Sequence, residues 1–429
     1  MKKFISLMLA VCLTLGLFGC GKEAAQQAPN AETNPPETTQ AAAAFSVGFG
    51  RGDITPDVGI QLGGYGGNNR ACEGVLDYLY STCVAIRDDQ GNTVLVMTSD
   101  MVRGNWADEL RKAVSDATGL PVENVIHATT HTHSGAEPLL EAGYQVVVSK
   151  AMVKAAQDAL EDLSPATAEI GSSHVENMSF VRHYVSPSGA VFGDNFGEGT
   201  PVRHTTEADD LLQVIRFNRE GKKPVVMINW QGHPTLASTG SDESKAKRLL
   251  ASADYVGACR QYVEQEGDCL FAFYLSGSGN LNAYSRIAGE GVKSHTVYGE
   301  KLGKAVMDVL GNMTAVETGT VQCTEKVYEG KSPTGEPAKT SYSGIATGDI
   351  SFVTSQFEMF DTNARNIKDN TPFKMTFVLT LTNGRFGYMP TQECWDYPGC
   401  YEVESCKLER GGAEIMEENY MNLLAELKG

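Results

Sequence analysis

Hydrophobic positions along the chain follow two spacings. In residues 145–163 the apolar positions recur at intervals of three and four, with Lys and Asp between them, at Val148, Met152, Ala155, Ala156 and Leu160. That spacing places them on one face of an amphipathic helix. The same pattern predicts helices at 106–117, 249–264, 295–310, 357–368 and 412–427. Short apolar runs bounded by polar residues or Gly predict strands at 82–87, 93–98, 212–217, 225–230, 270–275, 350–354 and 375–381.

These helices and strands are mixed along the chain without a regular strand–helix alternation. This order favours a mixed α/β (α+β) fold in which central β-sheets are flanked by helices. Residues 45–429 contain no second linker and no repeat, so we expect a single large domain. A long segment of little periodicity, 185–210, lies within it, and such a loop usually forms a lid or a wall of a functional site.

The first residues have the pattern of a bacterial targeting segment. Lys2 and Lys3 precede an apolar run at 4–18, which has the length of a signal peptide and is short for a membrane span. The run ends at Gly19-Cys20, which resembles the cleavage box of bacterial lipoproteins. We therefore expect residues 1–19 to be a lipoprotein signal peptide and Cys20 to be lipidated. An ordinary signal peptide or an uncleaved anchor is the alternative.

Residues 20–44 are rich in Ala, Gln, Pro, Thr and Glu and have no apolar periodicity. Such a composition cannot bury a core and predicts a disordered tether. Two or three acyl chains on Cys20 are enough for stable membrane anchoring. The N-terminus thus predicts an extracytoplasmic lipoprotein of a bacterial cell membrane.

Charge and cysteine content restrict the partners and the metal chemistry. The formal net charge is −18, which does not suit a phosphate backbone, so nucleic acid is not an expected partner. Of ten cysteines, eight remain when Cys12 and Cys20 are set aside, and an even number outside the cytoplasm permits disulfides. Cys394 and Cys400 are close enough to close one loop. No Cys-x-x-Cys pair occurs, which argues against a thiolate zinc site.

The strongest chemical signal is the His-Thr-His-Ser-Gly motif at 131–135. A strand predicted at 121–130 runs into this Gly-containing loop. On an extended backbone residues i and i+2 point the same way, so we expect both rings to reach one point in space. Two imidazoles so placed suit a metal site or an acid/base pair. Two polar loop histidines without a shared role are the alternative.

His233 is the best partner for these rings among the eight histidines. It follows the strand predicted at 225–230, and the ligands of a catalytic metal are commonly collected from several strand ends. A capped loop imidazole is the alternative for His233.

Two other metal-hydrolase folds fit the chain poorly. A metallo-β-lactamase would have His-x-His-x-Asp-His, but Ser134, Gly135 and Ala136 follow His133 here. A TIM-barrel amidohydrolase would have its His-x-His near the first strand and regular βα repeats after it.

Six blocks of the chain resemble the neutral/alkaline non-lysosomal ceramidases and their bacterial relatives, in the order in which that family has them. The blocks span 48–402, nearly all of the predicted domain. Because the chain ends soon afterwards, the resemblance implies the catalytic domain alone, without the Ig-like domain of larger ceramidases. The blocks are Gly-Arg-Gly-Asp-Ile-Thr-Pro (50–56) with Gly-Gly-Tyr (63–65), Thr-His-Thr-His-Ser-Gly (130–135), Ile-Asn-Trp (228–230) with His233, Gly-Ser-Gly-Asn-Leu-Asn (277–282), Gly-Asp-Ile (348–350) with Phe-Glu-Met-Phe (357–360), and Thr-Asn-Gly (382–384) with Gly-Tyr-Met-Pro-Thr (387–391) and Tyr-Glu (401–402).

The resemblance implies a zinc site. In the family the catalytic zinc is held by the first His of His-Thr-His, a distant His, a Glu and a Tyr, which match His131, His233, Glu358 and Tyr388. Two imidazoles with carboxylate and phenolate oxygens suit Zn²⁺ and leave a position for water. The residues before Glu358 differ from the family's, and an exposed Glu at a helix start is its alternative. A half-buried strand aromatic is the alternative for Tyr388.

The same match implies groups on the substrate side of the metal. His133 would lie beside the metal or contact substrate, and would steady or shuttle a proton. Arg182 matches an Arg that hydrogen-bonds the substrate, although its neighbours differ from the family's. Tyr401 would donate a hydrogen bond to the developing oxyanion, with one extra residue between it and Tyr388.

The main departure from the family is Asn282. Ceramidases have Gly-Asp-Val-Ser-Pro-Asn, in which the Ser is the proposed catalytic residue, and this chain has Asn at that place. An amide side chain cannot serve as an activated hydroxyl nucleophile. Asn282 is instead a further candidate donor to the oxyanion, and a simple tight turn is the alternative for 277–280.

The chain is therefore predicted to be an extracytoplasmic zinc-dependent hydrolase of an N-acyl amide, such as a ceramide-like lipid, or of an ester. Zinc would lower the pKa of a bound water to about 7, and the hydroxide would attack the carbonyl carbon. A surface-anchored binding protein without turnover is the alternative, because the family's Ser is missing. An esterase or peptidase acting on a non-lipid substrate would use the same site.

Overall fold

The computed structural model describes residues 44–65, 69–104, 106–137, 141, 143–193, 200–238 and 248–429. Ala42–Gly429 belongs to a single structural unit. The predicted signal peptide, Cys20 and the predicted tether up to residue 43 lie outside the described residues.

A nine-stranded sheet carries most of the long apolar runs. Its order is β14-β12-β11-β6-β1-β3-β4-β5, with β16 paired to β6; the β12–β14 and β4–β5 pairs are parallel. The sheet curves so that its two ends approach each other. Near those ends, Oη of Tyr274 in β14 donates to the carbonyl oxygen of Val96 in β4 at 2.8 Å. The strands are β1 (Ser46–Asp53), β3 (Tyr80–Arg87), β4 (Thr93–Ser99), β5 (Val125–Thr129), β6 (Ser164–His174), β11 (Leu211–Arg219), β12 (Val225–Trp230), β14 (Leu270–Leu275) and β16 (Thr314–Val316).

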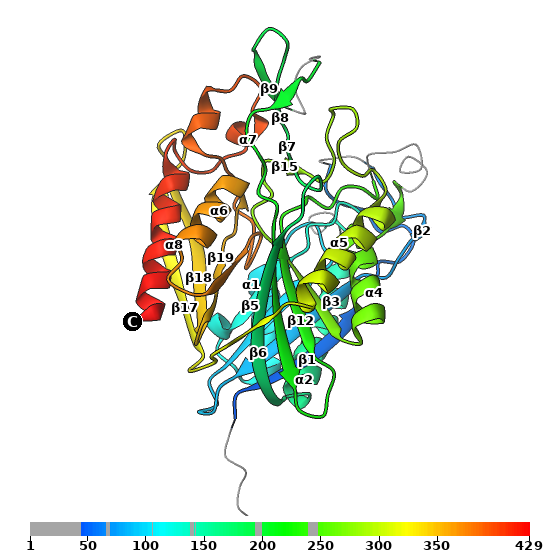
Figure 1. Cartoon of the computed structure of the whole chain (residues 1–429), viewed down its shortest axis with the longest axis vertical. Coiled ribbons are helices and arrows are strands. Elements are labelled where there is room, and N and C mark those ends of the chain that lie inside the picture. The colour runs from blue at the N-terminus through cyan, green and yellow to red at the C-terminus, as the bar shows by residue number, and fades with distance from the viewer. Residues whose placement is uncertain are drawn as a thin grey trace, which may run out of the picture. The chain divides into compact units, whose positions relative to one another are not determined.

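A four-stranded sheet shares one hydrophobic core with the large sheet. Its order is β17-β18-β19-β21, and side chains such as Phe352 and Phe377 pack with Val84 and Ile215 of the large sheet. Helices cover the outer faces of both sheets (Figure 1). This mixed α/β arrangement confirms the predicted fold class. The strands of the small sheet are β17 (Gln322–Lys331), β18 (Pro337–Thr347), β19 (Ile350–Thr354) and β21 (Met375–Leu379), and the helices are α1 (Ala107–Thr118), α2 (Tyr144–Glu161), α4 (Tyr255–Gly267), α5 (His295–Leu310), α6 (Asp361–Asn370) and α8 (Gly412–Lys428).

The continuous apolar runs of the central strands follow from burial on both faces. In β3, Val84 and Ile86 point into the core between the sheets, whereas Cys83 and Ala85 pack with the helices α1 and α2. Successive side chains of a strand alternate between its faces, so a strand covered on both sides needs apolar residues at every position.

Strand β1 and helix α2 meet backbone against backbone. A Cβ added at Gly48, Gly50 or Gly52 would collide with the carbonyl oxygens of Ala159, Ala155 and Ala151, one helical turn apart. The alternate glycines of the strand and the alanines at every fourth position of the helix therefore let the two backbones come so close that no strand side chain would fit between them.

Two predicted helices begin later than expected, because short strands precede them. Within 249–264, β13 (Leu250–Ala251) pairs with β2 (Gly74–Val75), and α4 begins after Asp254, whose side chain accepts the N–H of Tyr255. Within 357–368, β20 (Glu358–Met359) pairs with β22 (Tyr388–Met389), and α6 begins at Asp361. In both places apolar residues of a strand continued the helical spacing by chance.

Other elements departed from the sequence pattern. The strand predicted at 121–130 is shorter, since Val122–Asn124 forms a 3-10 turn before β5. The segment 185–210 is not irregular throughout, because β8 (His183–Val185), β9 (Val191–Gly193) and β10 (Arg203–His204) form a small sheet. Residues 194–199 of that segment lie outside the described residues.

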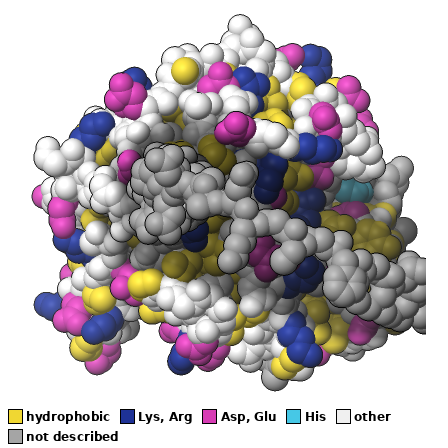
Figure 2. Space-filling model, turned by 90° about the horizontal axis from the view of Figure 1, so that it is seen from below, with side chains coloured by type: hydrophobic (Ala, Val, Ile, Leu, Met, Phe, Trp, Pro, Cys, Tyr) yellow, Lys and Arg dark blue, Asp and Glu magenta, His cyan; other side chains and the backbone are white. Residues whose placement is uncertain are grey.

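The described surface mixes charges of both signs. On the face drawn in Figure 2, acidic and basic side chains are interspersed with polar and apolar ones. Among the described residues, no helix has both the length and the apolar character needed to cross a membrane.

Candidate metal centre

Three histidine side chains meet near the ends of two strands of the large sheet. His131 and His133 lie shortly beyond the end of β5, and His233 lies shortly beyond the end of β12. The backbone N–H of His133 donates to the carbonyl oxygen of Pro234 at 3.0 Å, which joins the two loops. We call His131, His133 and His233 the histidine centre.

The backbone at His131 is left-handed, with φ +64°. The extended backbone expected between His131 and His133 is therefore wrong, although both rings still reach one point. The N–H of His131 donates to the carbonyl oxygen of Met101 at 2.9 Å, and its Nδ1 donates to that of Val102. These bonds hold a conformation that residues with a side chain seldom adopt, and such strain is concentrated at functional sites.

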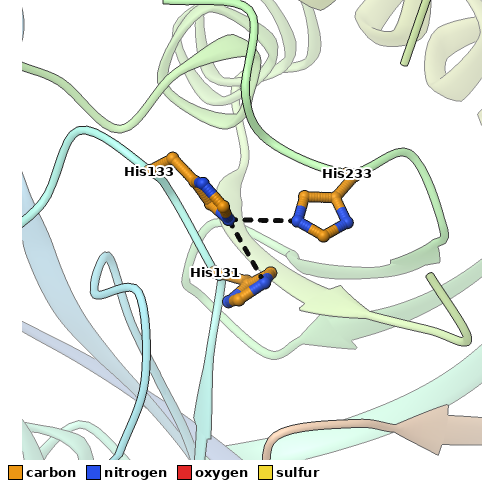
Figure 3. Close-up of side chains that lie close together, drawn as sticks. All are labelled: His131, His133 and His233. Carbon is orange, nitrogen blue, oxygen red and sulfur yellow. Dashed lines mark hydrogen bonds between the residues drawn. The ribbon is translucent and has the colours of Figure 1, made fainter. Parts of the chain in front are cut away.

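The three rings present their Nε2 atoms to one another (Figure 3). Nε2 of His133 lies 3.4 Å from Nε2 of His131 and 3.0 Å from Nε2 of His233. All three side chains are buried. Nitrogen atoms that face each other without a shared acceptor are arranged as ligands of a cation rather than as hydrogen-bond partners.

Hydrogen bonds on the far side of two rings fix which nitrogen is free. Nδ1 of His131 donates to the carbonyl oxygen of Val102, and Nδ1 of His233 donates to that of Ser278 at 3.2 Å. Each Nε2 is then left with its lone pair directed into the centre, the orientation that metal-ligating imidazoles commonly have.

Burial keeps His133 and His233 neutral. Burial and the neighbouring imidazoles hold the pKa of His133 well below its usual value, and burial and His131 do the same for His233. Neutral imidazoles are the form that binds metal, so no proton has to be displaced from these two rings near neutral pH.

Glu358 completes one side of the histidine centre. Its Oε2 lies 3.4 Å from Nε2 of His131, and among the described residues that oxygen has no hydrogen-bond partner of normal geometry. Oε1 accepts from Nη2 of Arg385 at 3.2 Å. Burial would raise the pKa of Glu358, but His131 and Arg385 outweigh it and hold the pKa well below its usual value. The alternative of an exposed Glu at a helix start is wrong, because Glu358 is a buried strand residue.

Tyr388 is brought beside Glu358 by strand pairing. The two residues are Cα partners in the parallel β20–β22 pair. Tyr388 is a buried strand aromatic, and its Oη lies 2.8 Å from Oη of Tyr401 and 3.5 Å from Nη2 of Arg182. Burial and the charge of Glu358 raise its pKa, so the phenol is protonated in the metal-free protein.

Arg182 forms the opposite wall. Its Nε donates to Oε1 of Glu402 at 2.7 Å, and its Nη2 donates to the carbonyl oxygen of Gly279 at 2.6 Å and to Oη of Tyr401 at 2.5 Å. Burial lowers the pKa of this guanidinium, but Tyr401 and Glu402 reverse that effect and raise it well above the usual value. Arg182 is therefore a fixed cation.

Asn282 and Asn280 have different surroundings although they are two residues apart. Asn282 lies in β15 (Leu281–Asn282), paired with β7 (Phe180–Val181), and lines the cavity. Asn280 instead donates to Oδ1 of Asp361 at 2.7 Å and accepts the N–H of Asp361 at 2.9 Å. The stretch 277–280 thus anchors the start of α6, and Asn282 is the member that faces the site.

One cavity of about 500 Å³ is lined by all the residues predicted to form the site. Its volume is in the range usual for small-molecule sites. The structure thus brings together side chains from seven separate chain segments, namely His131, His133, Arg182, His233, Asn282, Glu358, Tyr388 and Tyr401.

Sequence reasoning missed several residues of the cavity. Arg385 is paired with Glu358, and its signal was a single charged residue inside the last matched block. Arg103 is paired with Glu137 at 3.0 Å and carried no motif. Gly64 lies so close to the ring of His133 that a Cβ would collide with it, which explains the glycines before Tyr65.

The donor set fits a divalent metal ion of borderline softness. Imidazole nitrogens and carboxylate and phenol oxygens of His131, His233, Glu358 and Tyr388 face one region. Oε2 of Glu358, which has no hydrogen-bond partner of normal geometry in the described part of the chain, is the atom a cation would satisfy. The nitrogen of His133 is as near, so three imidazoles rather than two face the centre.

Comparisons with known proteins agree with this architecture. A protein-family model described as neutral/alkaline non-lysosomal ceramidase, N-terminal, matches residues 45–369. The crystal structure of neutral ceramidase from Pseudomonas aeruginosa matches with a TM-score of 0.71 at 14% identity, over 90% of this chain and 74% of that one. A ceramidase complexed with C2 matches with a TM-score of 0.73 at 13% identity, over 90% and 75%. At such identities the structural matches show the fold.

Proposed function

The chain belongs to the neutral/alkaline non-lysosomal ceramidase family, and from that premise we propose that it is a zinc-dependent hydrolase of an acyl-amide bond, with ceramide-like lipids as the first substrate class and esters as the second. The observation that carries the proposal is the convergence in one cavity of three Nε2 atoms with Oε2 of Glu358, which has no hydrogen-bond partner of normal geometry among the described residues.

We propose His131, His233, Glu358 and Tyr388 as the zinc ligands. Zinc bound there supplies a Lewis acid and lowers the pKa of water to about 7. The carbonyl acceptors on Nδ1 of His131 and His233 hold the two rings in the tautomer that ligation needs. Arg385 holds Oε1 of Glu358, which leaves Oε2 turned toward the imidazoles.

Arg182 and Tyr401 are proposed to bind the carbonyl oxygen of the substrate. Three acceptors already fix the guanidinium, so its position costs no reorganisation during the reaction. The charge of Arg182 polarises the hydroxyl of Tyr401, which it contacts at 2.5 Å. Preorganised donors of this kind each contribute about 2.7–4 kcal/mol to stabilisation of the transition state.

His133 is proposed to carry a proton between water and the leaving group. Its lowered pKa keeps the ring neutral near pH 7, so it can accept a proton. Among the described residues its Nδ1 has no hydrogen-bond partner, in contrast to Nδ1 of His131 and His233. A ring that is not fixed on its far side can change its protonation without breaking a structural bond.

Asn282 bears on the alternative function. Because this amide occupies the place of the family's Ser, a direct attack by a side-chain hydroxyl at that position is excluded. In the hydrolase Asn282 donates a hydrogen bond to the substrate. The same substitution is the observation that favours the alternative, a non-catalytic binding protein on a ceramidase-like scaffold.

An activity panel separates the two functions. The purified whole chain, loaded with zinc, is assayed by mass spectrometry on ceramides, other N-acyl lipids, N-acyl amino acids and the matching esters. We expect release of fatty acid that stops on chelation and returns with zinc. Binding of panel lipids to zinc-loaded protein, without release of product from any of them, would establish the binding protein instead.

The cellular location is a separate proposal. Lys2, Lys3, the apolar run and Gly19-Cys20 support a lipid anchor on Cys20 and an extracytoplasmic bacterial protein. We expect the mature N-terminal peptide to begin with an acylated Cys20, as measured by mass spectrometry. A Cys20→Ser variant should leave the membrane fraction, and an unchanged membrane association of that variant would contradict the anchor.

A further inference from the structure

A second buried group of metal-binding side chains lies outside the histidine centre. His183 in β8, Cys400 and Glu402 place one ligand atom each within 4.8 Å of one another. Glu402 belongs to the short helix α7 (Tyr401–Glu404), and Cys400 directly precedes it. We call these three residues the thiol cluster. In Figure 1, α7 and β8 lie at the same end of the molecule.

The three ligand atoms form a nearly equilateral triangle. Nε2 of His183 lies 3.2 Å from Oε2 of Glu402 and 3.6 Å from Sγ of Cys400, and Sγ lies 3.3 Å from Oε2. The centre of such a triangle is roughly 2 Å from each corner, close to zinc–ligand bonds of about 2.0–2.3 Å. His183, Cys400 and Glu402 are 1%, 5% and 1% exposed, so water has little access.

A second thiol lies beside the thiol cluster, although its Sγ is not among the ligand atoms that all lie within 4.8 Å of one another. The side chain of Cys394 lies in contact with that of Cys400, and Cys394 is also buried. All eight described cysteines are free thiols, so neither sulfur is committed to a disulfide. With the Cys394 side chain turned toward the centre, two thiolates, an imidazole and a carboxylate would close a tetrahedral site, as structural zinc requires.

We propose that His183, Cys400 and Glu402, with Cys394 as the fourth ligand, form a second zinc site that is structural rather than catalytic. Thiolate sulfur with imidazole nitrogen selects zinc over magnesium and calcium, which prefer oxygen ligands alone. The absence of Cys-x-x-Cys argued against a thiolate site in the sequence. The fold nevertheless brings the imidazole of His183 in β8 to Cys400 and Glu402 from about two hundred residues upstream.

Without metal the thiol cluster is satisfied by protons. Nε2 of His183 and Sγ of Cys400 both donate hydrogen bonds to Oε2 of Glu402, at 3.2 and 3.3 Å. Zinc replaces the protons of His183 and Cys400, since a coordinating thiol is deprotonated outright.

The thiol cluster also reaches the histidine centre through one carboxylate. Oε2 of Glu402 faces His183 and Cys400, and Oε1 accepts from Nε of Arg182 at 2.7 Å. Zinc on Oε2 would fix the carboxylate and, through it, the guanidinium in the cavity. Glu402 is thus a positioning residue for Arg182.

The test counts zinc ions in the purified whole chain by elemental analysis. We expect two per chain in the wild type, one in Cys400→Ser, and one in the His131→Ala/His233→Ala double variant. Cys323→Ser is the matched control, because the thiol of Cys323 donates to the carbonyl oxygen of Glu123 away from either cluster; it should retain two.

Cobalt substitution supplies a spectroscopic readout that can already be measured on the wild type. Co²⁺ bound to a thiolate has a sulfur-to-metal charge-transfer absorption in the near ultraviolet, which the wild type and the histidine double variant should both show and Cys400→Ser should lack. The band in the double variant separates this site from the proposed hydrolase, because it does not depend on the histidine centre. A wild type without that band, or a Cys394–Cys400 disulfide in the unreduced protein, would overturn the proposal.

Discussion

Arg182 links the histidine centre and the thiol cluster, since its Nε donates to Glu402 and its Nη2 lies 3.5 Å from Oη of Tyr388. Burial lowers the pKa of the imidazoles in both, but their neighbours act in opposite ways. In the histidine centre like groups face each other, so burial and mutual repulsion push the pKa of His133 and His233 down. In the thiol cluster complementary groups face each other, and the pKa of His183 rises to about 9.

The comparison teaches how a buried cluster signals its need for a cation. The histidine centre has an acceptor oxygen on Glu358 without a partner in the described structure, and its lone pairs face inward. It is incomplete without a positive ion. The thiol cluster closes its own hydrogen bonds, and a metal would replace protons there rather than fill a vacancy. Ligand atoms lie close together in both clusters. The two therefore differ in which of their groups carry protons when no metal is bound.

The largest expected effect comes from removing the histidine centre. The His131→Ala/His233→Ala variant should lose hydrolysis by more than the ~10²–10³-fold that loss of one oxyanion donor costs, because it loses the metal itself. Activity is measured on the best substrate of the panel, with bound zinc counted alongside. His174→Ala is the control, since that histidine is exposed and pairs with Asp210. Unchanged activity and metal content in the double variant would refute the centre.

Next is the carboxylate that joins the two clusters. Glu402→Gln should destabilise the protein by about 3–5 kcal/mol, because it leaves the guanidinium of Arg182 buried without its ionic partner. Urea unfolding at constant zinc concentration measures it. Glu404→Gln, at an exposed position in the same short helix, should stay within about 0.5 kcal/mol of the wild type. Equal stability of the two variants would contradict the link.

The pH dependence of the metal-free protein sharpens the contrast. The His183–Glu402 ion pair stabilises the folded protein fully between about pH 4.5 and pH 6.5, which are the ordinary pKa values of the two groups. Its contribution falls as pH rises through about 9 and as pH falls toward about 2. The alkaline loss should approach about 3 kcal/mol. Denaturant unfolding across this range measures it, and a His183→Gln variant with an equally steep alkaline loss would show that another group is responsible.

Acid should release the two metals at different pH. Among the imidazole ligands, protons compete for His183 at higher pH than for His233, because the pKa of His183 is raised and that of His233 is lowered. The cobalt–thiolate band should therefore disappear at least about one pH unit above the loss of hydrolysis. Simultaneous loss on a single acid titration would contradict the difference between the clusters.

The smallest effect is expected at the residue that departs from the family. Asn282→Ser should keep activity within about tenfold, because the hydroxyl can still donate a hydrogen bond and no side-chain nucleophile is needed, whereas Asn282→Ala should lose about 10²-fold. Steady-state kinetics on one substrate compares them. A large gain in Asn282→Ser, with a covalent acyl-enzyme detected by mass spectrometry, would show that the wild type lacks its nucleophile.

The sequence was most informative where burial alone decides structure. Strands at 225–230, 270–275 and 350–354 have the predicted bounds, because both of their faces are covered. β17 and β18 escaped prediction. Every second position over most of β17 is exposed, and these positions carry Glu, Val and Lys, so no apolar run forms.

The candidate site divides in the same way. All eight residues predicted for it line one cavity, because motifs name residue types at strand ends and the fold gathers those ends. The left-handed backbone of His131 was not predictable, since it depends on bonds to Met101 and Val102, which follow the end of β4. The thiol cluster was missed because its members have no fixed spacing along the chain.

The contact of β1 with α2 has a mechanical consequence. The backbones of this strand and this helix are in direct contact, with no room for even one added methyl group. The pair is therefore held at a fixed distance and orientation. At one end of this pair the chain leaves β1 toward Gly64, which lies against His133, and at the same end α2 begins at Tyr144, whose hydroxyl donates to the carbonyl oxygen of Ile54. The three glycines of β1 thus fix the end of the strand from which the chain, about ten residues later, reaches Gly64 and the ring of His133.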